Sequence, residues 1–243
     1  MKINTDKTKV LVFNTDPETK NLTFNIQNSI KPIIEPSAYI EILGILVDCD
    51  LNWKKQINRI KRNSMGKIRN IHRFNNMLPL QHRKNLYNAI ISPQFDYGDV
   101  LIGGANQKEL NGLQRIQNFA AKSILGKKKR YSNRKTLKEL QFLNLEQRRK
   151  IHRTVFIHKA LLNKSSINLH RIFSKYNPNF NTRNSTKRNL TIPSHNSSKF
   201  KRSPLYKMIN DWNDTPNNLP KDNIRLHKIG FQKHLIATVL SEY

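Results

Sequence analysis

Two aspartates, Asp48 and Asp50, stand close together at the end of an apolar run. If that run is an extended strand, the two carboxylates point to the same face, where they could hold a divalent metal ion. The pattern also fits a strand that ends in a turn, with Asp50 as the N-cap of the next helix. We favour the second interpretation, and the sequence therefore predicts no metal site.

The apolar run itself, from Tyr39 to Val47, is rich in β-branched residues and indicates a buried strand. Gly44 within it marks either a bulge or a place where another backbone or a ligand comes close. A helical pattern begins directly after Asp50 and continues to about residue 75. The chain therefore changes from strand to helix periodicity at Asp48, and nearly everything after it is predicted to be helical.

The charge is the strongest constraint on function. The 243 residues include 44 Lys and Arg but only 16 Asp and Glu, which gives a formal net charge of +28. An enzyme that acts on a small metabolite has no need of such self-repulsion, whereas a polyanionic partner makes it tolerable. Because the basic residues are spread over the whole chain, nucleic acid is favoured over an acidic membrane surface.

Cysteine content and hydropathy bear on the compartment. The single cysteine, Cys49, excludes an internal disulfide and a multi-cysteine zinc site, and it fits a reducing compartment. No apolar run approaches the roughly 18 residues of a membrane span, and residues 1–4 do not resemble a hydrophobic signal segment. We therefore expect a cytoplasmic or nuclear protein without a membrane partner.

Strand patterns precede helix patterns along the chain. Short strands at residues 8–13, 22–26 and 39–47 are expected to form a small, mostly antiparallel sheet. In the part that follows, Pro79 and Pro93 are expected to start new helices, and Pro93 also ends the helix before it. A further helix, with apolar residues from Leu110 to Ile124, is expected to close at Gly126. The fold class predicted is α+β, mostly α-helical.

The second half of the chain is less apolar. A capping box at Thr136 and Glu139 predicts a helix start, and a further helix is expected between Leu145 and Leu162. Residues 163–203 are rich in Asn, Ser and Lys and are predicted to be a long loop or disordered. Two helices are expected in residues 204–243, the second around Phe231, Leu235 and Val239.

Several segments, taken in order, resemble the reverse transcriptases of non-LTR (LINE-like) retrotransposons. The first resembles the motif just after the catalytic aspartates, the second the junction of palm and thumb, and the rest the helices that follow. The family often has Trp near position 102, where this chain has Ile102-Gly103. The segments are NTDKTKVLVF at 4–13, YIEILGILVDCDLNW at 39–53, LYNAIISPQFDYG at 86–98, LQRIQNFA at 113–120, and Trp212-Asn213 with Leu219-Pro220.

This resemblance implies a division of the chain. Residues 1–48 would be a palm remnant of three strands, and residues 49–130 a thumb-like helical bundle. Residues 131–243 would be a basic C-terminal helical region that contains the loop at 163–203. Because the sequence enters the family pattern at a strand, the rest of the palm and the fingers are expected upstream, lost, or supplied as a partner.

The same resemblance bears on catalysis. The family polymerises with divalent metal ions that two adjacent aspartates hold, and this sequence contains no Asp-Asp dipeptide. We therefore expect the isolated chain to be inactive and to need no cofactor, with Mg²⁺ used only if a catalytic palm is supplied. Lys7 matches a family lysine that protonates the leaving pyrophosphate or steadies the triphosphate, so it is a vestigial catalytic candidate. A solvated lysine beside a strand is the alternative.

Binding residues are predicted in two places. Leu43 and Gly44 match the family hairpin that grips the primer end, and a glycine lets a sugar–phosphate backbone come close. A simple bulge is the alternative there. On the first long helix the excess of positive charge predicts contacts to the phosphates of an RNA–DNA or DNA duplex. These helix residues are Lys54, Lys55, Arg59, Lys61 and Arg62.

The sequence therefore predicts the non-catalytic C-terminal part of a mobile element's reverse transcriptase. In this role the chain would hold primer and template by their backbones. A stand-alone basic nucleic-acid-binding protein without any connection to polymerisation is the main alternative. A third possibility is an active polymerase fragment that needs its missing half.

Overall fold

The structure is a computed structural model of the chain, and it is mostly helical with short antiparallel strand pairs. This confirms the predicted α+β, mostly α-helical class. Most of the chain between residues 37 and 214 is described, together with short pieces outside that range. The described residues are 8–13, 24–25, 33–34, 37–74, 77–161, 172–173, 190–214, 229–230, 233–234 and 237.

The predicted single strand from Tyr39 to Val47 is wrong, because this segment folds back on itself. Strand β3 (Tyr39–Ile42) pairs antiparallel with β4 (Ile45–Asp48), and Ile42 lies opposite Ile45. The two residues between them, Leu43 and Gly44, have φ angles of 47° and 79°. Two positive φ values give the turn whose twist matches that of antiparallel strands. The segment is therefore a tight hairpin, which is also the arrangement that the family resemblance implies for Leu43 and Gly44.

The expected three-stranded sheet is not formed by the residues that the structure describes. Strand β1 (Phe24–Asn25) pairs with β2 (Ile33–Ile34) in a separate two-stranded unit. The first predicted strand makes a single bridge, in which the N–H of Ser37 donates to the carbonyl of Val10 at 2.8 Å. Among the residues described before Tyr39, strand content is thus smaller than the sequence pattern predicts.

Asp48, and not the predicted Asp50, joins the hairpin to the first long helix, α1 (Lys54–Arg73). The Asp48 carboxylate accepts the backbone N–H groups of Asn52 and Trp53, both at 2.8 Å. Asp50 accepts only a long bond, 3.4 Å, from the exposed side chain of Asn52. Trp53 is in the N-cap position with φ 61°, so the chain turns sharply between strand and helix.

The predicted break at Pro93 is wrong as well. Helix α2 (Leu80–Leu86) runs through a π-helical turn, η2 (Tyr87–Ile91), directly into α3 (Ser92–Asp96). The N–H of Ser92 bonds to the carbonyl of Tyr87, five residues earlier. Proline lacks an N–H and crowds the carbonyl four residues before it, and a wider π turn at this point relieves both problems. The continuous helical segment formed by α2, η2 and α3 ends at Tyr97. Helix α4 (Asp99–Ile102) starts after Gly98, whose φ is 67°.

Helix α5 (Gln107–Leu125) ends at Gly126 with φ 65°, as the sequence predicts. The predicted capping box at Thr136 and Glu139 is wrong, because α6 (Asn133–Leu140) starts three residues earlier, after Ser132. The hydroxyl of Thr136 lies inside the helix and donates to the carbonyl of Ser132 at 2.7 Å.

Three further helices follow α6, and residues 229–230, 233–234 and 237, which come later in the chain, are helical as well. The three helices are α7 (Leu145–Leu161), α8 (Ser198–Arg202) and α9 (Pro204–Asn213). Helix α8 lies in the predicted loop at 163–203, which is therefore wrong for those five residues. Ser197 caps α8 by accepting the N–H of Phe200 at 3.1 Å. The last predicted helix, around Phe231, Leu235 and Val239, falls on positions outside the described residues.

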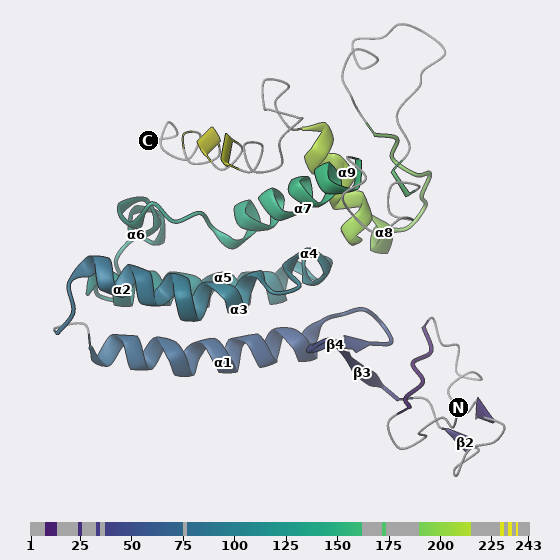
Figure 1. The fold of residues 1–243 in the computed structure, drawn as a ribbon, viewed down its shortest axis with the longest axis horizontal. Helices are drawn as coiled ribbons and strands as arrows, with labels where there is room; N and C mark the ends of the chain where they lie inside the picture. Colours follow the sequence, from purple (N-terminus) through teal and green to yellow (C-terminus); the bar gives the residue numbers. More distant parts are fainter. Residues whose placement is uncertain are drawn as a thin grey trace, which may run out of the picture.

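The helices lie in layers (Figure 1). Helix α1 runs along one side, α2, α3 and α5 lie next to it, and α7 covers the opposite side of that layer. One apolar core joins α1 to the middle layer, and a second lies between α7 and α9. In the part of the chain that the structure describes, every helix is too short or too polar to cross a membrane.

The hydrogen bonds of Asp48 give a stability prediction. We expect Asp48→Ala to lower the free energy of unfolding by about 0.5–1.5 kcal/mol, because the backbone N–H groups of Asn52 and Trp53, just before α1, lose their acceptor. Asp50→Ala is the matched control and should change it by less than about 0.5 kcal/mol. Urea unfolding measures both variants. Equal effects of the two substitutions would contradict the assignment of this junction to Asp48.

Candidate nucleic-acid interface

Helix α1 carries many cations and no acidic residue of its own. Its buried side, which includes Ile57, Ile60, Ile68 and Ile71, packs into the core. On the opposite side, exposed residues recur at helical spacing and form one stripe along the whole helix. We call this stripe the cationic face: Lys55, Asn58, Arg62, Gly66, Arg69 and Arg73.

The geometry of the cationic face suits an extended polyanion. Lys55, Arg62 and Arg69 follow one another every seven residues, which is close to two full helical turns. With a rise of about 1.5 Å per residue, successive cations are about 10 Å apart along the helix axis. Arg62, Arg69 and Arg73 are exposed and have no ion-pair partner among the described residues. Their charge is therefore available to a ligand.

The five predicted helix cations do not share one environment. Lys54 and Arg62 are exposed, and the Nζ atom of Lys55 lies 3.5 Å from the ring centre of Tyr39. Two others, Arg59 and Lys61, are half-buried. Each forms an ion pair with a carboxylate on another element, so part of its charge is already used inside the protein. These pairs are Arg59 with Glu41 on β3, at 2.9 Å, and Lys61 with Glu109 on α5, at 2.7 Å.

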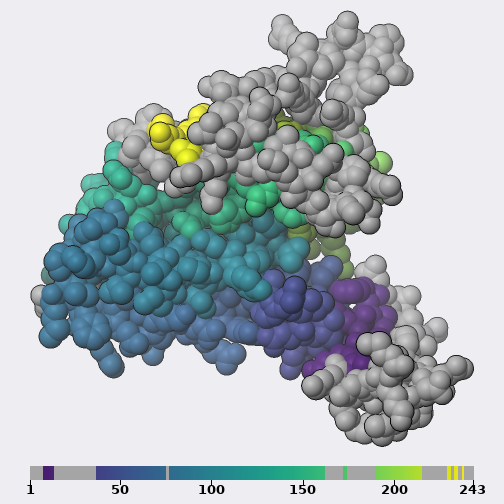
Figure 2. Space-filling model, in the orientation of Figure 1, coloured from purple at the N-terminus to yellow at the C-terminus, as the bar shows by residue number. Residues whose placement is uncertain are grey.

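The hairpin and α1 together enclose a shallow hollow of about 560 Å³. Figure 2 shows the surface of α1 along the lower edge of the molecule, with the surface of the hairpin adjoining it. Three predicted cations line the hollow, and the hairpin adds a wall that sequence reasoning did not foresee. The lining residues are Tyr39, Leu46, Lys55, Asn58, Lys61 and Arg62.

Leu43 and Gly44, the predicted primer-end residues, lie apart from this hollow. They form the hairpin tip, where Leu43 is 86% exposed and its carbonyl accepts a hydrogen bond from the hydroxyl of Tyr97. A Cβ atom added to Gly44 would lie 3.8 Å from the Tyr97 ring, an ordinary contact, so the positive φ is what requires glycine. The other predicted residue, Lys7, is outside the described residues.

Gly66 on the cationic face has no structural explanation inside the protein. A Cβ atom added there would meet nothing within 4 Å. A glycine inside a helix costs about 1 kcal/mol relative to alanine, so this position lowers stability without improving any packing. It leaves the backbone uncovered between Arg62 and Arg69. Sequence reasoning missed it, although an isolated glycine in a basic helix was a visible signal.

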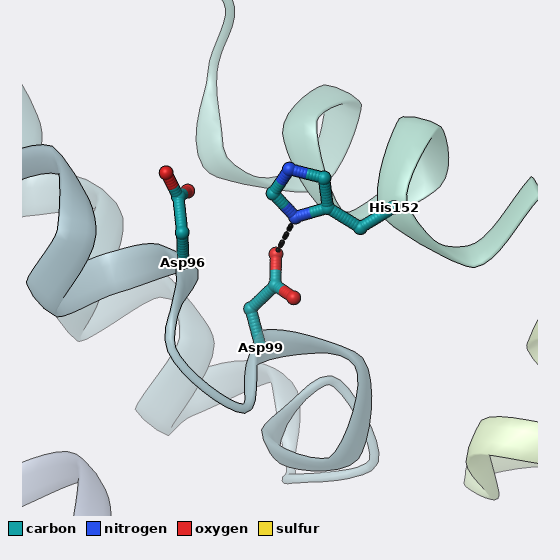
Figure 3. Close-up of side chains that lie close together, drawn as sticks. All are labelled: Asp96, Asp99 and His152. Carbon is teal, nitrogen blue, oxygen red and sulfur yellow. Dashed lines mark hydrogen bonds and ion pairs between the residues drawn. The ribbon is translucent and has the colours of Figure 1, made fainter. Parts of the chain in front are cut away.

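A second cluster, Asp96, Asp99 and His152, could in principle hold a metal ion, since its ligand atoms lie within 4.8 Å of one another (Figure 3). Nδ1 of His152 is 2.6 Å from the Asp99 carboxylate. Asp96, however, accepts two hydrogen bonds from the Arg148 guanidinium, one of them at 3.0 Å from Nε. That cation already neutralises Asp96, so these groups are better suited to tying α7 to α3 and α4.

The charge state of Arg148 agrees with this assignment. Burial alone would lower the pKa of the guanidinium, but the hydrogen bonds and charge of Asp96 raise the pKa above its ordinary value. Arg148 therefore keeps its charge beside Asp96. Sequence reasoning did not connect these residues because His152 and Arg148 are more than fifty positions from their partners along the chain.

Comparisons with known proteins returned no match: no protein-family model matches the sequence, and no curated protein or solved structure matches it. The resemblance to non-LTR reverse transcriptases stays a prediction that depends on the segments quoted above.

Removing the Arg148 guanidinium tests whether the Asp96 cluster is structural. We expect Arg148→Met to lower the free energy of unfolding by about 1.5–3 kcal/mol, because Asp96 loses two charged hydrogen bonds. Arg69→Met, at an exposed position without a partner among the described residues, is the control and should cost less than about 0.5 kcal/mol. Urea unfolding gives both values. A saturable rise of the melting temperature with Zn²⁺, abolished by His152→Ala, would instead identify a metal site.

Proposed function

We propose that this chain binds duplex nucleic acid through the phosphate backbone, using the cationic face of α1 and the adjoining hollow beside the hairpin. One observation carries the proposal. A long helix without any acidic residue presents an exposed stripe of basic and amide side chains, interrupted only by Gly66, and Arg62, Arg69 and Arg73 have no ion-pair partner in the described part of the chain.

The residue types on the cationic face favour backbone contacts over base reading. Lysine and arginine neutralise phosphates, and Asn58 can donate to phosphate oxygens. Such contacts position a duplex without specifying its sequence. Gly66 lets one stretch of the phosphate backbone come close to α1 between Arg62 and Arg69. The expected ligand is therefore a duplex of any sequence, bound along the helix.

The more specific form of the proposal is that the chain is the non-catalytic C-terminal part of a non-LTR retrotransposon reverse transcriptase. The order of a hairpin, a long basic helix and a helical bundle supports it, because the family resemblance implies that order. The missing palm and fingers would be the protein partner. Without an aspartate pair, the isolated chain would hold primer and template but not extend the primer, and Mg²⁺ would act only in a supplied palm.

A stand-alone nucleic-acid-binding protein is the second candidate, and one observation favours it. The hairpin tip at Leu43 and Gly44, to which the resemblance assigns the primer end, does not line the hollow that the helix cations form. Equal affinity for a blunt duplex and for a duplex with a recessed primer end would favour this candidate. A preference for the recessed end would favour the reverse-transcriptase fragment.

The salt dependence of binding tests the cationic face. We expect the combined variant Lys55→Gln, Arg62→Gln, Arg69→Gln and Arg73→Gln to flatten the plot of log affinity against log salt concentration. The slope should change by about 0.9 units for each phosphate that the variant no longer neutralises on B-DNA, or by about three to four units in all. Fluorescence polarisation on two unrelated duplexes, over a range of salt concentrations, measures it.

The control removes the same charge elsewhere. The run from Lys127 to Arg130, between α5 and α6, is exposed, and replacing its four cations with Gln gives a matched variant. Both variants should keep their helical circular dichroism, because the replaced side chains are exposed. An equal flattening of the slope in the two variants would show that overall charge, and not the cationic face, drives binding.

Gly66→Ala separates stability from binding. We expect it to raise the free energy of unfolding by about 1 kcal/mol, because alanine favours the helix and meets no neighbour. If a phosphate backbone packs on Gly66, the same substitution should lower duplex affinity about tenfold, or about 1.4 kcal/mol. Asn85→Ala on α2, outside the cationic face, is the control and should leave affinity unchanged. A stabilised Gly66→Ala protein with undiminished affinity would rule out close approach at Gly66.

A further inference from the structure

A cavity of about 430 Å³ lies between α5, α6 and α7, and none of its lining residues belongs to α1. Its volume is in the range of small-ligand sites. Leu110, Leu137 and Phe142 give it apolar walls. The rest of the lining is dominated by side-chain amides, which the proposed duplex binding does not use. These amides belong to Gln107, Asn111, Gln114, Asn118, Asn133, Asn144 and Gln147.

Backbone N–H groups determine which way two of the amides are turned. The side-chain oxygen of Asn144 accepts the N–H of Gln147, and the side-chain oxygen of Gln147 accepts the N–H of Asn144, both at 2.9 Å. Since a backbone N–H can only donate, the oxygen ends of both side chains are used. Their NH₂ ends have no partner among the described residues and remain as donors at the cavity.

Two hydrogen bonds of Gln114 determine the orientation of a third amide, Asn118, and leave its NH₂ group as a donor too. The side-chain oxygen of Gln114 accepts the N–H of Leu145 at 2.9 Å, so the Gln114 nitrogen must be a donor. That nitrogen donates to the side-chain oxygen of Asn118 at 2.9 Å. The NH₂ group of Asn118 is therefore a third donor that has no bond within the described part of the chain.

The one carboxylate at the cavity does not offset these donors. Glu146 is bonded to Arg149 at 2.9 Å and to Arg153 at 2.6 Å. Although burial alone would raise the pKa of Glu146, the two guanidinium groups lower it below its ordinary value, so it stays ionised and paired. The cavity thus has apolar walls and an excess of hydrogen-bond donors.

A flat ligand whose edge carries acceptors fits this combination. A bare phosphate would leave the apolar walls unused. Among nucleobases, guanine presents two adjacent acceptors, O6 and N7, and thymine or uracil presents carbonyl oxygens, whereas adenine and cytosine place an amino donor next to their acceptors, where it would face the NH₂ groups of the cavity. Unpaired bases are commonly stacked on aromatic side chains, of which Phe142 is one here, and hydrogen-bonded along their edges. The keto bases are therefore the class that matches three fixed NH₂ groups.

We infer that this cavity binds a single unpaired keto base, guanine or uracil/thymine, of a nucleic-acid strand. Asn118, Asn144 and Gln147 donate to its carbonyl edge, and Leu110, Leu137 and Phe142 pack against its faces. This goes beyond the duplex binding proposed for α1 and does not depend on it, because the two sites have no lining residue in common.

The test compares short single strands of equal length at one salt concentration. We expect the wild-type chain to bind oligo(U) and a guanine-rich strand about tenfold more tightly than oligo(A) in fluorescence polarisation. Asn118→Asp keeps the oxygen that Gln114 needs and replaces the donor NH₂ with an acceptor. It should abolish this preference and reduce the affinity for oligo(U) about tenfold, while circular dichroism stays unchanged.

Asn85→Asp is the matched control, since its side-chain oxygen accepts a bond from Gln81 at 3.0 Å across one helical turn, as Asn118 does from Gln114. It should keep the preference. Equal reductions of affinity in the two variants, or equal wild-type affinity for all strands, would overturn the inference. Competition on the wild-type chain needs no variant: uridine should displace oligo(U), and inorganic phosphate should not. Displacement by phosphate as effective as by uridine would overturn it as well.

Discussion

The packing of α1 on the middle layer is the interaction on which the rest of the structure depends. Helix α1 repels itself, because some of its cations lie three or four residues apart, as Lys55 and Arg59 or Arg69 and Arg73 do, and each such pair costs about 0.2–0.5 kcal/mol. Burying one isoleucine contributes about 1.5–3 kcal/mol, and Ile57, Ile60, Ile68 and Ile71 are all buried. Tertiary packing therefore outweighs the repulsion, and it also decides which side of the helix faces outward.

The few carboxylates are placed where elements meet. Four carboxylates in the described part of the chain each pair with a cation on another helix or strand, and those cations are distinct from the unpaired ones that face outward on α1. A chain with so large an excess of positive charge can in this way keep specific internal ion pairs and still present an unpaired basic surface. The pairs are Glu41 with Arg59, Glu109 with Lys61, Asp96 with Arg148, and Asp211 with Arg153.

The sequence predicted features that depend on local chemistry and missed those that depend on distant contacts. The end of α5 at Gly126 and the basic outer side of α1 follow from residue types alone. The turn at Leu43 and Gly44 was missed from the residues because leucine is unusual at a positive φ. The choice of Asp48 over Asp50 as the acceptor for the N–H groups just before α1 depends on where the hairpin ends. The amide cavity could not be predicted from the sequence, because three helices contribute to it. In the sequence, isolated Asn and Gln residues resemble ordinary surface residues.

Helix α5 links the two proposed sites, which depend on different physics. Through Glu109 it holds Lys61 beside the cationic face, and along another side it presents Asn111, Gln114 and Asn118 to the cavity. The binding proposed for α1 would depend on counterion release and weaken steeply with salt, whereas a base in the cavity would be held by short-range hydrogen bonds and apolar packing, which salt screens little. A strand that leaves a duplex on α1 and places an unpaired base in the cavity would gain affinity from both sites, although the sites themselves do not touch. The layered packing of the helices keeps the two proposed sites on separate surfaces of one small fold.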